Sequence, residues 1–95
     1  MTKVIFRKEF PENGGGIIAV FPSKAGDSNP YRTCLCYAPV GQHSAMSLKY
    51  MKGTFPAQPS EYSDLYSELV SLGYDLDVCT RFSKKDLQSR KEQCK

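Results

Sequence analysis

Residues 60–82 read SEYSDLYSELVSLGYDLDVCTRF, and the spacing of the large side chains in this stretch predicts a helix followed by a strand. In residues 61–72 the large side chains recur every three or four positions, as in a helix with one apolar face. Gly73 suits the left-handed residue that commonly follows a helix. In residues 74–82 apolar and polar side chains alternate, which predicts a strand with one apolar face. A helix joined to a strand by one glycine indicates a helix that lies on a sheet.

Three earlier stretches predict the rest of that sheet. Residues 3–10, 17–21 and 32–38 are rich in β-branched and aromatic residues, and turn-forming residues separate them. We therefore predict an α+β domain with two layers, in which a largely antiparallel four-stranded sheet carries one main helix on one face. The predicted order along the chain is strand, strand, strand, helix, strand.

One helix of about three turns is too small to cover both faces of a four-stranded sheet. The second face is therefore predicted to be polar or to meet a partner. Its apolar side chains favour a partner, and they are Ile17, Ile18, Val20 and Leu35. The leading hypothesis is a non-enzymatic interaction module that acts as a homodimer, formed through the surface or the edge of the sheet.

Positive charge is concentrated at the C-terminal end of the sequence. The chain of 95 residues has a net charge of +3, and residues 81–95 contain six basic and two acidic residues. Because these residues offer little to bury, residues 83–95 are predicted to form a mobile basic tail beside a single domain of residues 1–82. The alternative function is an accessory nucleic-acid-binding protein that uses this tail. Its candidate contacts are Lys84, Lys85, Arg90 and Lys91.

The candidate binding loop consists of Gly41, Gln42, His43 and Ser44. It lies in the long irregular connection of residues 39–58, and long connections often carry function. His43 is the single histidine of the sequence and the natural candidate for acid–base chemistry, with Cys36 or Ser44 as its nucleophile. The competing interpretation is a loop histidine whose ring nitrogens bond to backbone groups. No catalytic residue is assigned, and an enzyme is not the expected class.

Four cysteines and one histidine allow one metal interpretation. A zinc site can be drawn from Cys34, Cys36, Cys79 and His43, but the C-x-C spacing differs from that of common zinc sites. We therefore predict no metal and no cofactor. The sequence lacks the apolar core of a signal peptide and any apolar run of the roughly 20 residues that a membrane span needs. The expected location is the cytoplasm, with reduced thiols and no membrane partner.

Three short motifs carry a resemblance to a known family: IAVFP at residues 18–22, VGQH at residues 40–43 and LGYDL at residues 72–76. The chain resembles a family of small uncharacterised bacterial proteins associated with phages and other mobile elements. The resemblance spans about residues 4–82, and Ser44 stands where the family pattern leads us to expect glycine. It implies no activity, cofactor or residue role, but it draws attention to the same loop around His43.

Overall fold

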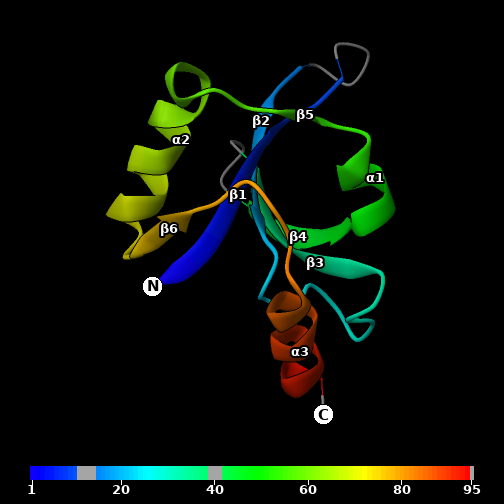
Figure 1. Ribbon diagram of the computed structural model, residues 1–95. Helices are drawn as coiled ribbons and strands as arrows, with labels where there is room; N and C mark the ends of the chain where they lie inside the picture. The colour runs from blue at the N-terminus through cyan, green and yellow to red at the C-terminus, as the bar shows by residue number, and fades with distance from the viewer. Residues whose placement is uncertain (11–14, 39–41, 95) are drawn as a thin grey trace.

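The structure is a computed structural model that describes residues 1–10, 15–38 and 42–94 (Figure 1). Within these ranges the chain forms an α+β fold with six strands and three helices. The strands are β1 (Thr2–Lys8), β2 (Ile17–Phe21), β3 (Thr33–Ala38), β4 (Gln42–Ser47), β5 (Phe55–Pro56) and β6 (Leu76–Val78). The helices are α1 (Leu48–Lys52), α2 (Pro59–Ser71) and α3 (Lys84–Gln93). None of these helices has the length and apolar content needed to cross a membrane.

The strands form one sheet that is antiparallel along its main path. The strand order is β4-β3-β2-β1-β5, and β6 pairs with β1 in parallel. One row of paired residues across the sheet consists of Phe6, Ala19, Tyr37 and His43. The adjacent row consists of Ile5, Val20, Cys36 and Ser44. Because successive side chains of a strand point to opposite faces, these two rows lie on opposite faces of the sheet.

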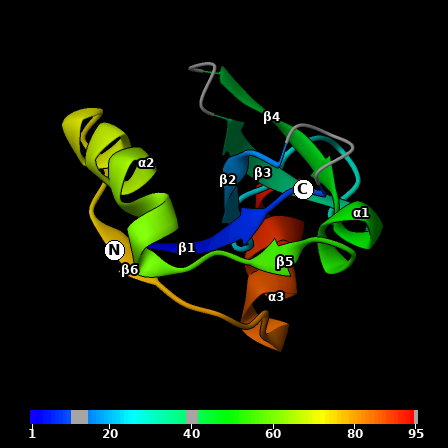
Figure 2. The same ribbon diagram turned by 90° about the horizontal axis from the view of Figure 1, so that it is seen from above.

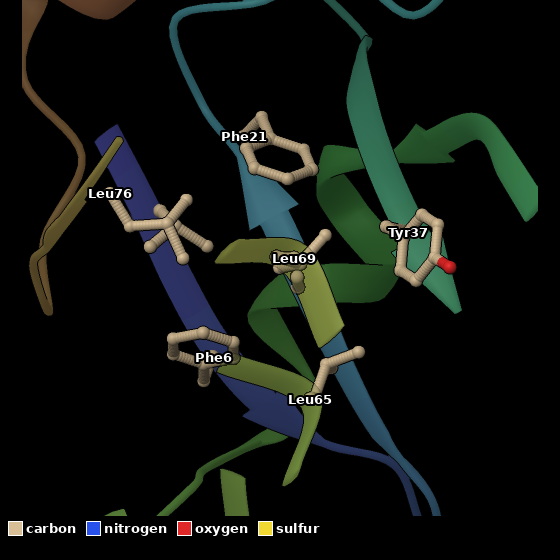
Figure 3. Close-up of a cluster of buried hydrophobic side chains, with 8 residues drawn as sticks. Phe6, Phe21, Tyr37, Leu65, Leu69 and Leu76 are labelled. Carbon is tan, nitrogen blue, oxygen red and sulfur yellow. The ribbon is translucent and has the colours of Figure 1, made fainter. Parts of the chain in front are cut away.

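Helix α2 covers one face of the sheet, and we call this face the α2 face. Leu65 and Leu69 project from α2 onto the sheet, and Leu69 is fully buried. Figure 3 shows them packed against four side chains of the strands, namely Phe6, Phe21, Tyr37 and Leu76. The ring of Tyr62 adds to this core by stacking on Phe6, with centroids 4.2 Å apart. Gly73 follows the helix with φ of +104°, so the predicted helix and its glycine stop are confirmed.

The opposite face is covered by the chain itself, and the prediction of a polar or partner-covered face is wrong. This face carries a second core made of Ile5, Ile18, Val20, Cys34, Cys36, Met46 and Met51. Met51 comes from α1, whereas the half-buried side chains of Cys79 and Phe82 come from the segment between β6 and α3. Figure 2 shows α1 and α2 on opposite sides of the sheet. The sequence pattern missed this cover because a five-residue helix and an irregular segment carry no periodic signal.

The α+β class and the largely antiparallel sheet are confirmed, but the layout of four strands and one helix is only roughly matched. The connection of residues 39–58, predicted to be irregular, contains β4, α1 and β5. Strand β4 pairs with β3 over six residue pairs, and this tertiary pairing overrides the weak strand propensity of its sequence QHSAMS. The last predicted strand, residues 74–82, is limited to β6, where three residues pair with β1.

The sequence predicts a mobile tail over residues 83–95, but the structure has helix α3 there, packed against the domain (Figure 1). The guanidinium of Arg90 is buried and donates to the carbonyl oxygens of Pro22 and Pro30. The buried carboxylate of Asp86 accepts a hydrogen bond of 2.8 Å from Lys3. Composition did not predict this docking because polar contacts between residues far apart in sequence, and not an apolar stripe, hold the helix.

Candidate functional site

The predicted binding loop around His43 is largely a strand. Gly41 lies outside the described residues, and β4 begins at Gln42 and continues through His43 and Ser44. The imidazole of His43 is exposed, and its Nε2 lies 2.7 Å from the hydroxyl oxygen of Tyr74. This ring nitrogen therefore bonds to a side chain. The sequence-based alternative to a catalytic His43 was a loop histidine whose ring nitrogens bond to backbone groups.

His43 belongs to a cluster of rings on the α2 face. Its ring centroid lies 4.8 Å from that of Tyr37, 6.0 Å from that of Tyr74 and 6.4 Å from that of Phe21. A hydrogen bond from the Tyr37 hydroxyl to the Glu68 carboxylate raises the pKa of Tyr37. Burial raises the pKa of Tyr74. Both phenols are therefore neutral near pH 7, and the cluster provides no tyrosinate base.

The two nucleophiles considered for His43 lie on the other face of the sheet. Cys36 and Ser44 are paired in the row opposite to the one that holds His43. Their side chains contact each other, with Sγ and Oγ 3.2 Å apart. A general base must reach the proton that it removes within hydrogen-bond distance. The structure does not bring His43 to either side chain, so the prediction of Cys36 or Ser44 as the nucleophile of His43 is wrong.

The zinc interpretation fails for the same geometric reason. Cys34 and Cys36 line the second core, whereas His43 packs with the rings of the α2 face. In the part of the chain that the structure describes, no group of three or more His, Cys, Asp or Glu side chains could hold a metal ion. Burial raises the pKa of Cys34 to about 12, so this thiol stays protonated and packs as a small apolar group.

The four basic residues predicted to contact nucleic acid differ in burial and in contacts. Lys84 and Lys85 are exposed in the first turn of α3. Arg90 is only 4% exposed, and its guanidinium is bound to backbone carbonyls of the β2–β3 connection. Lys91 lies over the ring of Tyr31, with its Nζ 5.6 Å from the ring centroid. Arg90 is thus a structural residue, and Lys91 lies beside the ring of Tyr31.

Tyr31 also lines a basic groove that was not predicted from the sequence. A cavity of about 500 Å³ is lined by Tyr31, Arg32, Ser47, Leu48, Lys49 and Lys52. A second cavity of about 250 Å³ is lined by Tyr31, Leu48, Met51, Lys52, Phe82, Ser83 and Arg90. The two share three residues, and we call them together the Tyr31 groove. The sequence held one signal, because Lys49 and Lys52 are three positions apart, but only the fold brings them beside Tyr31.

Strand β4 forms an edge of the sheet and pairs with β3 alone among the strands of the described ranges. Its six residues include no charged residue and no proline, which are the usual features that prevent edge strands from pairing with other chains. The far side of the sheet is protected, because β5 has two residues, one of them Pro56, and β6 has three. The β4 edge is therefore the part of the sheet most suited to pair with another strand.

No protein-family model, curated protein or solved structure matches this chain. The resemblance to the phage-associated family therefore stays a prediction.

Proposed function

We propose that this protein is a non-enzymatic interaction module that acts as a homodimer, joined through the β4 edge of its sheet. The observation that carries the proposal is the six-residue edge without charge or proline. Two copies of β4 placed antiparallel would satisfy each other's outward backbone groups and continue the sheet across a two-fold axis. The surface of the sheet, the other predicted interface, is not available because residues of the chain cover both faces.

The side chains of β4 support this role. Those of His43, Ser44, Ala45 and Ser47 are exposed, and three of the four are small. A second strand can therefore approach the edge without displacing a bulky or charged group. The same region argues against a catalytic pair, since His43 contacts neutral phenols, and the side chains of Cys36 and Ser44 lie on the other face of the sheet.

Light scattering coupled to size-exclusion chromatography at micromolar concentration tests the proposal, and about twice the chain mass of 10.7 kDa is expected. The variant Ala45→Lys is expected to elute as a monomer, because the two copies would bring like charges close together across the new strand pair. Ser67→Lys is the matched control, since it adds the same charge at an exposed position of α2 and should leave the dimer intact. A monomeric wild-type protein, or an Ala45→Lys variant as dimeric as the wild type, would overturn the proposal.

A further inference from the structure

The Tyr31 groove lies on the face of the sheet opposite to α2. Two of its lining residues, Leu48 and Met51, belong to α1, which packs on the second core. Figure 2 places α1 and α2 on the two sides of the sheet. The groove is therefore separate from the cluster around His43, and it shares only Ser47, the last residue of β4, with the proposed dimer edge.

The groove carries positive charge that the rest of the described chain does not neutralise. Arg32, Lys49 and Lys52 are exposed and form no ion pair in the described ranges. The two ion pairs found there lie elsewhere and join Lys3 to Asp86 and Lys8 to Glu61. Unpaired cations that line a concavity raise the local concentration of anionic ligands.

Negative charge gathers on the opposite side of the molecule. A separate cavity on the α2 side is lined by Glu61, Asp64 and Glu68 together with Ile17 and Leu65. The acidic residues of α2 are thus separated from the Tyr31 groove by the sheet and its two cores. This arrangement orients an approaching polyanion toward the groove and away from α2.

Tyr31 adds an aromatic surface to these cations. Its side chain is 63% exposed, so most of the ring faces solvent. Its backbone is held in place, because its N–H donates to the side-chain oxygen of Asn29 at 3.2 Å and the neighbouring Pro30 carbonyl accepts from buried Arg90. A ring on a fixed backbone, with Phe82 lining the other cavity, suits stacking against planar groups.

We propose that the Tyr31 groove binds single-stranded nucleic acid. The phosphates lie along Arg32, Lys49 and Lys52, and a base stacks on the ring of Tyr31. A duplex keeps its bases stacked inside and offers no free face to the tyrosine, so a single strand fits the groove better. A lone phosphate group would use only a part of the groove, because the cations extend over both adjoining cavities.

Fluorescence anisotropy of a labelled thymidine or uridine oligonucleotide of about 12 residues tests this inference at low and physiological salt. The triple variant Arg32→Gln/Lys49→Gln/Lys52→Gln is expected to bind at least about tenfold more weakly than the wild type. The slope of its log affinity against log salt concentration should be smaller in magnitude by about 2. The matched control is Lys24→Gln/Lys84→Gln/Lys85→Gln, which removes the same charge at exposed positions that do not line the groove. It is expected to bind much as the wild type does.

A second pair of variants tests the stacking contact separately from charge. Tyr31→Ala is expected to weaken binding about 5- to 100-fold, whereas Tyr31→Phe keeps the ring and should retain the affinity. All these positions are exposed, so unfolding of the variants, checked by circular dichroism, is not expected.

Four outcomes would overturn the inference. The first is no binding by the wild type at low salt with about 100 μM protein. The second is an equal loss of affinity in the two triple variants, which would show that net charge and not the groove decides binding. The third is unchanged affinity of Tyr31→Ala, and the fourth is equal binding of inorganic polyphosphate, which has charge but no base. The dimer is measured independently, so failure of one proposal is distinguishable from failure of the other.

Discussion

His43 and Tyr74 are joined by a hydrogen bond of 2.7 Å between the imidazole Nε2 and the phenol oxygen. This bond ties the edge strand β4 to the residue that follows α2 and its terminal glycine. The ring of Tyr74 also stacks on Phe21, with centroids 5.1 Å apart. His43, the acid–base candidate of the predicted loop, thus connects the edge of the sheet to the segment that follows α2.

The variant Tyr74→Phe is expected to lower the free energy of unfolding by about 1 kcal/mol, because it removes the hydrogen bond and keeps the stacked ring. Urea denaturation followed by circular dichroism measures the change. Tyr66→Phe is the control, since no hydrogen bond of the Tyr66 hydroxyl is found in the described ranges and the change should be small. Equal losses in the two variants would show that the His43 bond contributes nothing to stability.

Arg90→Met is expected to lower the free energy of unfolding by about 2–4 kcal/mol, because the buried carbonyl oxygen of Pro22 and the half-buried one of Pro30 lose their donor. The effect should appear as a lower urea midpoint and faster proteolysis within α3. Arg81→Met removes the same charge from an exposed position before α3 and should change stability by less than about 0.5 kcal/mol. If Arg90→Met proved as stable as Arg81→Met, α3 would be the mobile segment that the sequence predicts.

Gly26→Ala is expected to destabilise the fold by about 1–3 kcal/mol, because the new Cβ would meet rigid backbone. It would lie 2.5 Å from the carbonyl oxygen of Cys34 and 2.9 Å from the Cα of Ala45. At Gly16 the nearest atom to an added Cβ is a flexible Glu9 oxygen at 3.7 Å, so Gly16→Ala is the tolerated control. Thermal unfolding of the two variants measures the difference, and equal melting temperatures would show that the connection after β2 can move away from β3.

Stability is expected to fall as the pH rises from about 9 toward 12. Burial raises the pKa of Cys34 to about 12, so in alkali the unfolded chain loses this proton before the folded chain does. The contribution of Cys34 to the free energy of unfolding is complete below the pKa of this thiol in the unfolded chain. It disappears as the pH rises past the pKa of the thiol in the folded chain. The raised pKa values of Tyr37 and Tyr74 act in the same direction.

Urea midpoints measured from neutral pH to about pH 11 test this dependence. The variant Cys34→Ala is expected to lose stability less steeply, since one of the groups responsible is gone. Cys94→Ala, which removes a half-buried thiol at the end of α3, is the control and should follow the wild type. If the urea midpoints of Cys34→Ala and of the wild type fell equally steeply with pH, Cys34 would not be one of the groups responsible.

The parts of the fold that the sequence predicted are those with a local repeating signal. Leu65 and Leu69 follow the period of a helix with one apolar face, and both are buried in α2. Gly73 takes a positive φ that other residues rarely adopt. For such residues the pattern of neighbours in the chain is sufficient, because helix geometry fixes which side chains share a face.

The site around His43 was predicted poorly, because the pairing of β4 with β3 decides which side chains face each other. His43 and Ser44 are adjacent in sequence, yet they face opposite sides of the sheet once β4 pairs with β3. Arg90 looked like a free cation in a basic tail, but contacts with residues about 60 to 68 positions away bury it.

The sequence by itself determined the α+β class, the course of α2 and its glycine stop, because these depend on spacing within a few residues. Tertiary structure alone decided that β4 is the unprotected edge, that the second face is covered, and that Tyr31 lies beside Lys49 and Lys52. These features depend on pairing and packing between segments far apart in the chain. The energy of such contacts resides in neither segment alone, so no local pattern could have revealed them.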